Sequence, residues 1–285
     1  MSISAAQVNE LRKKTGAGMM DCKKALTEAG GDFEKAIEIL RKKGASVAAK
    51  RAEKTANEGM IATKISDDGQ FGAIVEVNCE TDFVAKSEDF TGLTNSVLTF
   101  VYENKINNVD DLLSSNNNIK IKVDEVMGKV GEKVQISRVA IEAAENGLLV
   151  DYVHMGSKLG VIVKFDNVTT GKEELTQIAK DIAMQVAAMR PLCVYREEVP
   201  KDIMDKEMEI YKELARKEGK PEQILEKIAT GRLNKFYQEN CLVEQAFIKD
   251  NTKSVSDLIN EFNKKNQTQT KIALFKRFHL GDENK

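Results

Sequence analysis

The spacing of hydrophobic residues divides the chain into helical and strand-like regions. Through residues 1–55, apolar residues recur three and four positions apart, which is the spacing of an amphipathic helix. The clearest set is Phe33, Ala36, Ile37 and Leu40. Glycine-containing breaks at 15–18 and 30–31 separate the helical runs, and a further helical stretch covers 46–54. We therefore expect a compact bundle of three short helices followed by a fourth helical segment.

From residue 56 onward, short apolar runs next to glycine predict strands, and the pattern occurs twice. Gly59 and Gly72 are 13 residues apart, as are Gly147 and Gly160, so the second copy lies 88 residues after the first. In the helix that follows each pair of strands, the apolar residues of the second copy also lie nearly 88 residues after those of the first. Chance similarity between glycine-bounded strands is the alternative explanation, and the shared spacing together with the shared helix register argues against it.

A third strand with alternating residues closes each copy, at 133–139 and at 272–278. Each copy then forms a small antiparallel sheet with a helix packed on one face. We therefore expect an α+β protein with a helical module at 1–55 and two related subdomains at 56–142 and 143–280.

Two charged helices with a narrow apolar seam interrupt the second subdomain. They cover 201–218 and 222–240, and Gly219-Lys220-Pro221 turns the chain between them. A narrow seam of this kind predicts an antiparallel coiled-coil hairpin, which we place at about 200–240. Such an arm serves as a partner-binding element as often as a spacer, and the sequence alone leaves both possibilities open.

The turn after the strand at 72–77 carries an acid and a large aromatic residue side by side, Asp82 and Phe83. A rigid strand-to-helix turn is a position from which such a pair can reach a partner. The alternative is one continuous helix that buries Phe83 and Phe90, seven residues apart, on a single face. Against it, Ser87 followed by two acids is typical of a new helix start, which leaves Phe83 on the turn. Exposure of the Phe83 ring decides between the two.

The composition is that of a soluble globular protein without a dominant charge. Hydrophobic residues make up 41% of the 285 residues and charged residues 31%, and the net charge is −2. Only the N-terminal module is basic, with 12 Lys and Arg against 7 Asp and Glu over residues 1–54, a net charge of +5. That excess suits an acidic protein surface or RNA. A solvated helix face is the favoured explanation, because no aromatic residues are interleaved to stack on bases.

Nothing in the sequence predicts a membrane, secreted or metal-binding protein. The first residues lack the apolar segment of a signal peptide, and no apolar run approaches the roughly 18 residues that cross a bilayer. The four cysteines lie far apart, which favours reduced thiols in a cytoplasmic protein. They are Cys22, Cys79, Cys193 and Cys241. With only His154 and His279 as imidazole ligands, we expect neither a metal site nor a cofactor.

The motifs of common catalytic sites are missing from the sequence. It contains no glycine-rich nucleotide fingerprint, no Gly-x-Ser-x-Gly elbow and no His-Glu-x-x-His pair. Cys79 beside Glu80 suggests a nucleophile, but neither histidine is near it in sequence, and a cysteine at a strand end is more often a small core residue. His154 on its own is more often structural than catalytic. An enzyme is therefore the least favoured class of function.

Three segments, together with the order of the parts, resemble the translation elongation factor Ts family. The segments are Leu11–Leu26, Val77–Ala85 and Tyr152–Val161. The order is a helical module, two related halves and a coiled-coil arm inside the second half. The resemblance runs from the first residues to about Gly281. Members of this family are nucleotide exchange factors for the GTPase elongation factor Tu.

The resemblance implies a fold and a mechanism of exchange. The N-terminal module would be a three-helix domain like the ubiquitin-associated (UBA) domain. The motif Thr81-Asp82-Phe83-Val84 would reach the magnesium and phosphate site of the partner. Asp82 would contact the partner's helical elements and Phe83 would insert between its side chains. Magnesium would then be dislodged and GDP would leave.

The resemblance also implies further partner contacts. Arg12, Met19 and Met20 match positions at which the module touches the nucleotide-binding domain of the partner. His154 and its glycine-rich neighbours match a surface that docks on another domain. The expected partner is elongation factor Tu in its GDP-bound and nucleotide-free forms, with no membrane and no direct nucleic-acid binding.

One departure from the family and one alternative function remain. Many members continue past the last strand into a helical segment that grips the partner, whereas this sequence ends at residues 281–285, so we expect that contact to be absent or replaced. The alternative to an exchange factor is an RNA-binding or chaperone-like adaptor that uses the basic module and the arm. Release of GDP from elongation factor Tu, with Phe83→Ala as the variant, separates the two.

Overall fold

Three helices form the N-terminal part of the structure, a computed structural model that describes residues 3–115 and 117–282. They are α1 (Ala5–Thr15), α2 (Met19–Glu28) and α3 (Phe33–Arg51). Ser4 caps α1 by accepting a hydrogen bond from Gln7 N, and Asp32 caps α3 in the same way. The buried side chains include Leu11, Cys22 and Leu26, so the module has a small core of its own.

The predicted fourth helical segment at 46–54 is not separate, because α3 continues without a break to Arg51. Gly44 lies inside this helix, where it meets α7 (Asn117–Val130). A Cβ atom on Gly44 would come within 2.5 Å of the Asp124 carbonyl oxygen. The glycine therefore permits a close helix crossing and does not end the helix.

The first sheet contains three antiparallel strands in the order β1-β2-β3. The strands are β1 (Glu58–Ile65), β2 (Phe71–Cys79) and β3 (Val134–Ala143). Between β2 and β3 the chain forms α4 (Asp82–Ala85), α5 (Glu88–Asn104), α6 (Val109–Ser115) and α7. Phe90, Val97 and Val101 of α5 are fully buried against one face of the sheet. This packing fixes α5, and with it the position at which α4 lies.

The second sheet repeats the arrangement, with β4 (Leu148–Val153), β5 (Leu159–Asp166) and β8 (Lys271–His279) in the order β4-β5-β8. Helix α8 (Lys172–Met189) covers one face through Ile182 and Val186. The remaining elements are η1 (Arg196–Glu198), α9 (Lys201–Lys217), α10 (Glu222–Asn240), η2 (Leu242–Glu244), β6 (Ala246–Phe247), β7 (Asp250–Ser254) and α11 (Val255–Asn266). The predicted hairpins, third strands and helical arm are therefore all present, and the fold is α+β.

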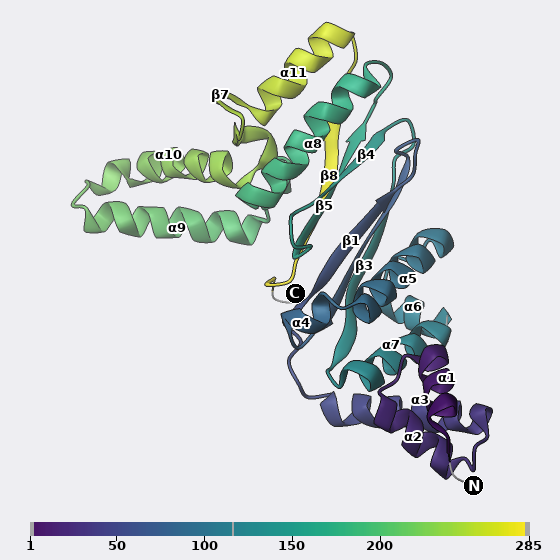
Figure 1. The fold of residues 1–285 in the computed structure, drawn as a ribbon. Helices are drawn as coiled ribbons and strands as arrows, with labels where there is room; N and C mark the ends of the chain where they lie inside the picture. Colours follow the sequence, from purple (N-terminus) through teal and green to yellow (C-terminus); the bar gives the residue numbers. More distant parts are fainter. Residues whose placement is uncertain (1–2, 116, 283–285) are drawn as a thin grey trace.

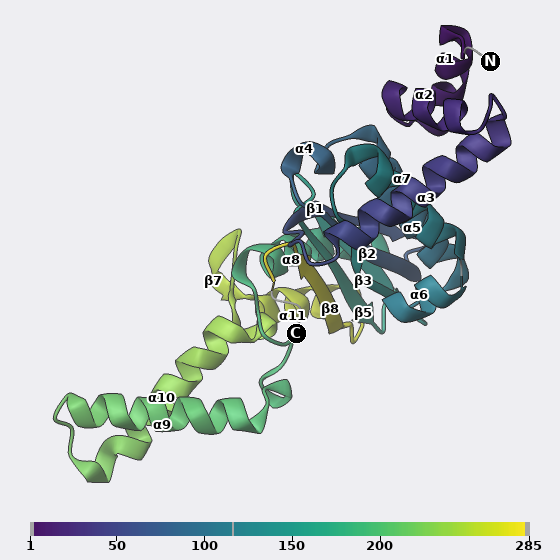
Figure 2. The ribbon, with the colours of Figure 1, turned by 90° about the horizontal axis from the view of Figure 1, so that it is seen from below.

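The two sheets pack face to face, with the helices on the outer faces (Figure 1). Buried residues from both sheets meet between them, including Ile61 and Ile74 from the first and Leu149 and Ile162 from the second. The helical arm and the N-terminal module lie at opposite ends of the molecule in both ribbon views (Figures 1 and 2). Among the described residues, none of the helices combines the length and apolar character needed to cross a membrane.

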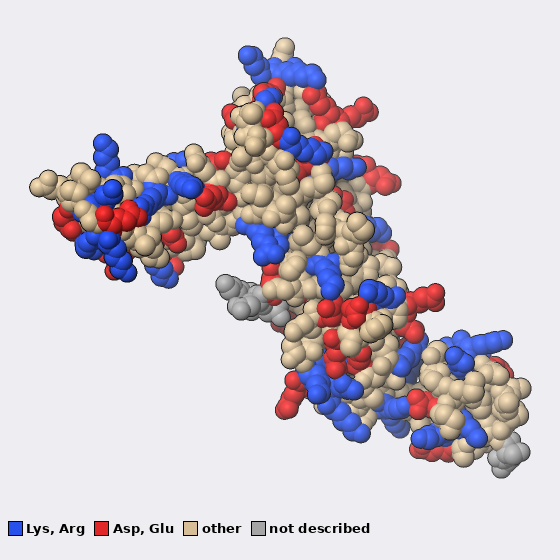
Figure 3. All heavy atoms as spheres, turned by 60° about the vertical axis from the view of Figure 1, so that its left-hand side comes forward, with Lys and Arg blue, Asp and Glu red and all other residues tan. Residues whose placement is uncertain are grey.

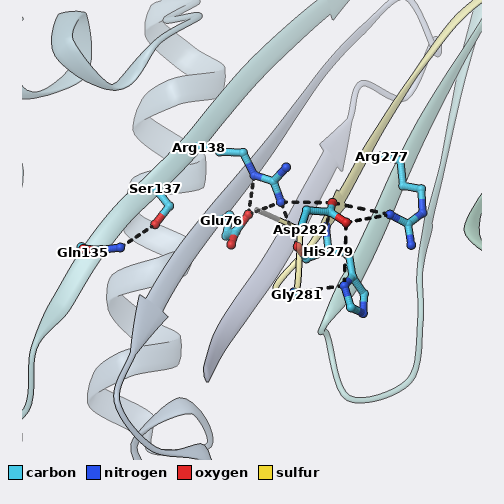
Figure 4. Close-up of polar contacts among 8 residues, drawn as sticks. All are labelled: Glu76, Gln135, Ser137, Arg138, Arg277, His279, Gly281 and Asp282. Carbon is cyan, nitrogen blue, oxygen red and sulfur yellow. Dashed lines mark hydrogen bonds and ion pairs between the residues drawn. The ribbon is translucent and has the colours of Figure 1, made fainter. Parts of the chain in front are cut away.

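A polar cluster joins the two sheets where the end of β8 meets β2 and β3 (Figure 4). Arg138 on β3 donates from Nε to Glu76 at 2.6 Å and from Nη2 to the carbonyl oxygen of His279 at 3.0 Å. Asp282 accepts from the backbone of His279 and from Arg277. These contacts fix the segment after β8 against the first sheet.

Candidate functional site

The segment between β2 and α5 is a single turn of helix, α4, where the sequence predicted a turn. Thr81 caps it, and its Oγ1 accepts a hydrogen bond from Val84 N at 3.4 Å. Ser87 begins α5, as predicted, by accepting from Phe90 N at 3.4 Å. Two caps only six residues apart make α4 a separate short element with no continuous helix through it.

The side chains of α4 divide into an inner and an outer pair. Val84 and Ala85 pack against the buried core of the first sheet. Phe83 points outward, with 84% of its surface exposed. The alternative in which Phe83 is buried beside Phe90 is therefore wrong, because the new helix start at Ser87 turns the chain between the two rings. An exposed phenylalanine on a fixed backbone is available for contact with another molecule.

Asp82 lies next to Phe83 and forms an ion pair within the site. Its Oδ2 accepts a hydrogen bond from Lys86 Nζ at 2.7 Å, with 43% of the Asp82 side chain exposed. This hydrogen bond, together with the charges of Lys86 and of Lys158, lowers the pKa of Asp82 below its ordinary value. Asp82 is therefore ionised at neutral pH and partly open to solvent.

The turn between β4 and β5 is joined to the same end of the first sheet. Ile61 N on β1 donates to the carbonyl oxygen of Ser157 at 2.7 Å, and Lys158 pairs with Glu58 at 2.6 Å. α4 packs on β1, and the charge of Lys158 acts on Asp82. The structure thus brings a second exposed turn close to α4.

His154 lies on that second turn and is exposed to solvent. Its Nδ1 is 2.8 Å from the hydroxyl of Tyr152, and the neighbouring Met155 is 91% exposed. Positive φ angles of 89° at Gly156 and 56° at Ser157 form the tight turn. The arrangement presents a polar ring and a flexible apolar side chain together.

The remaining predicted contact residues lie on the N-terminal module, apart from α4 (Figures 1 and 2). Met19 and Met20 open α2 and are 50% and 61% exposed. Arg12 lies in the last turn of α1 and is exposed as well. Adjacent exposed methionines suit a protein surface that packs against another protein.

Cys79, at the end of β2, is buried and does not have the features of a nucleophile. Burial raises the pKa of its thiol to about 12, and the charges of Glu132 and Glu58 act in the same direction. Its Sγ donates to the carbonyl oxygen of Thr81 at 3.2 Å. Over residues 3–115 and 117–282, no cluster of three or more His, Cys, Asp and Glu side chains could hold a metal ion.

Sequence reasoning missed one residue of this site, Glu132. It lies in the loop between α7 and β3 and accepts hydrogen bonds from both the backbone and the hydroxyl of Thr81. No local pattern marks it, because its partner is 51 residues away in the sequence.

Basic and acidic side chains are mixed over the face drawn in Figure 3, on the arm, the sheets and the module alike. This distribution agrees with the net charge of −2. The face drawn there lacks the continuous positive field with which proteins bind nucleic acid without sequence preference.

Comparison with known proteins gives one consistent result. A family model described as "Elongation factor TS" matches residues 80–282. The elongation factor Ts proteins of Chlorobaculum parvum and Chlorobaculum tepidum are each 48% identical to the chain, and that of Prosthecochloris aestuarii is 46% identical. In each case the match covers 98% of this chain and 99% of the relative.

Proposed function

The chain belongs to the elongation factor Ts family, and we propose that its short helix α4 promotes the release of GDP from elongation factor Tu. As a member of this family it is a nucleotide exchange factor for elongation factor Tu in translation elongation, and not an enzyme. Its effect on the partner therefore comes from binding. The observation that supports the role of α4 is the exposure of Phe83 on a backbone fixed at both ends.

The four residues 81–84 have two kinds of role in this proposal. Thr81 and Val84 hold α4 on the first sheet, while Asp82 and Phe83 meet the partner. Phe83 inserts between side chains near the magnesium and phosphate site, and Asp82 contacts the helical elements beside it. Magnesium stabilises the charge of bound phosphates, so its displacement weakens the hold on GDP.

An aromatic contact of this kind can supply the free energy that faster release of GDP requires. Each tenfold acceleration of release corresponds to about 1.4 kcal/mol, so a thousandfold effect requires about 4 kcal/mol. A buried aromatic anchor at an interface contributes about 2–4 kcal/mol, and lost magnesium ligation adds to it. The coupling is reciprocal, so the factor binds the nucleotide-free partner more tightly than the GDP-bound partner.

Two further surfaces complete the proposed interface. Arg12, Met19 and Met20 on the module contact the nucleotide-binding domain of the partner, and His154 contacts another domain. Their exposure supports this assignment, since all four side chains are open to solvent. Separate contacts on two domains orient the partner, so that α4 faces the nucleotide site.

The proposed domain organisation follows the predicted boundaries. Residues 1–55 form a UBA-like module, and 56–142 and 143–280 form two related subdomains, with the coiled-coil arm inserted at about 200–240. The two sheets have equivalent strand orders, which supports the proposal that the halves are related. The middle strands also start at equivalent positions, because β5 begins at Leu159, 88 residues after β2 begins at Phe71.

The experiment that tests this function follows the release of fluorescent GDP from purified elongation factor Tu. Adding the protein should accelerate release in a saturable manner. An unchanged release rate would exclude the exchange function. RNA binding that weakens steeply with salt, without faster release, would favour the RNA-binding adaptor.

A further inference from the structure

Glu132 holds the start of α4 through both oxygens of its carboxylate. Its Oε2 accepts from Thr81 N at 2.9 Å, and its Oε1 accepts from Thr81 Oγ1 at 2.7 Å. The hydroxyl of Thr81 donates to Glu132 and at the same time accepts from Val84 N, so its orientation is fixed from both sides. Hydrogen bonds to a charged acceptor are stronger and shorter than those between neutral groups.

The loop that carries Glu132 is itself anchored to the end of α3. Lys133 donates from Nζ to the carbonyl oxygens of Ala52 and Lys54, both at 2.9 Å. Its backbone N donates to Glu80 at 2.7 Å, and Glu80 also pairs with Arg51 on α3 at 2.8 Å. The two residues before α4 are therefore held by neighbouring residues of one loop. The backbone next to Glu132 is therefore anchored by the contacts of Lys133.

We propose that Glu132 is a positioning residue for nucleotide exchange, acting through Thr81 to fix the direction in which Phe83 points. The inference rests on the proposed function of α4. A helix of one turn is not stable by itself, so the geometry of α4 depends on its tertiary contacts. If α4 had to become ordered on binding, the lost conformational entropy would offset part of the binding free energy that Phe83 contributes. An α4 that is ordered before binding avoids this cost.

The variant that tests this is Glu132→Gln, which keeps the size of the side chain but removes one of its two acceptor oxygens and the charge. We expect the maximal rate of GDP release from elongation factor Tu to fall about tenfold, as for the loss of one charged hydrogen bond. The melting temperature should stay close to that of the wild type. Amide hydrogen exchange at residues 81–85 should become faster, because α4 is less ordered.

Glu125→Gln is the matched control, since it also converts a carboxylate into an amide; Glu125 pairs with Arg41 on α3 at 3.1 Å. It lies on α7 and should leave the release rate unchanged. A double-mutant cycle identifies the route of action: in a Phe83→Ala background, Glu132→Gln should cause no further loss. A structural role, or a direct contact of Glu132 with the partner, would lower the rate equally in both backgrounds.

A wild-type release rate for Glu132→Gln, or an equal loss with and without Phe83, overturns the proposal. If Phe83→Ala alone releases GDP at the wild-type rate, the proposed role of α4 and the positioning role of Glu132 are both wrong. If Phe83→Ala is slow while Glu132→Gln is fast, only the positioning role fails. Should Glu132→Gln lower the melting temperature, Thr81→Val carries the same test, because it removes only the hydroxyl contacts.

Discussion

At the residue scale, Phe83 combines an exposed ring with a backbone that is held on both sides. Thr81 caps the turn before it and Val84 packs into the core after it. The ring itself makes no contribution to the buried core, being 84% exposed. A residue that contributes little to folding yet occupies a fixed position has the properties of a binding residue.

Truncating Phe83 should therefore leave stability unchanged. For Phe83→Ala we expect the free energy of unfolding to change by less than about 0.5 kcal/mol, as for other surface substitutions. Phe90→Ala is the matched control, seven residues later and fully buried, and it should cost about 3–5 kcal/mol. Urea unfolding measures both. A loss above about 1 kcal/mol for Phe83→Ala would contradict its exposed position.

The ion pair of Asp82 predicts a titration that can be observed. Its pKa is lowered chiefly by the hydrogen bond from Lys86, so the stabilising pair is present above the ordinary pKa of an aspartate and is lost as the pH falls through the lowered value. Lys86→Met should raise the pKa of Asp82 towards the ordinary value of an aspartate, as followed by NMR. The pKa of Asp250 is lowered by Thr252 and should not respond. An Asp82 pKa at or above the ordinary value in the wild type would contradict the pair.

Sequence reasoning located the exposed pair of the site but not its support. Asp82 and Phe83 were predicted on a turn because the strand before them and the cap after them have local signals. Glu132 has no such signal, since its contact with Thr81 depends on how β3 pairs with β2. Contacts between distant segments arise only from the tertiary fold.

At the element scale, the period of apolar residues predicted the two hairpins, their third strands and the helical arm. It also predicted a separate fourth helical segment at 46–54, whereas α3 continues through Gly44 to Arg51. Helices α6, α7 and α11 were not predicted. A signal for α7 was present in the helical spacing of Ile119, Val123, Val126 and Met127. For α11 it was the capping box of Ser254 and Asp257.

The crossing of α3 and α7 predicts the effect of a single methyl group. Gly44→Ala places a Cβ atom 2.5 Å from the Asp124 carbonyl oxygen, so we expect a loss of about 1–3 kcal/mol from the forced separation of the helices. Gly92→Ala on α5 meets no atom within 4 Å and should stabilise by up to about 1 kcal/mol. Thermal unfolding compares the two. Equal stabilisation by both substitutions would exclude the close crossing.

At the scale of the whole molecule, the two three-stranded sheets differ in the segment that follows their middle strand. Both halves contain a three-stranded antiparallel sheet and a covering helix. In the first half α4 lies between β2 and α5, whereas in the second α8 begins at Lys172 directly after Gly171. At the offset of 88, residues 168–172 contain no acid and aromatic pair. The scaffold is thus repeated, and only one copy carries an exposed Asp–Phe pair.

If Phe83 drives release of GDP from elongation factor Tu, loss of its ring must slow that release. Stopped-flow release of fluorescent GDP is recorded at saturating concentrations of the wild-type chain and of Phe83→Ala. We expect rapid release with the wild type and a maximal rate at least about tenfold lower with the variant, as for an interfacial anchor. Release by Phe83→Ala at the wild-type rate would contradict this role of Phe83.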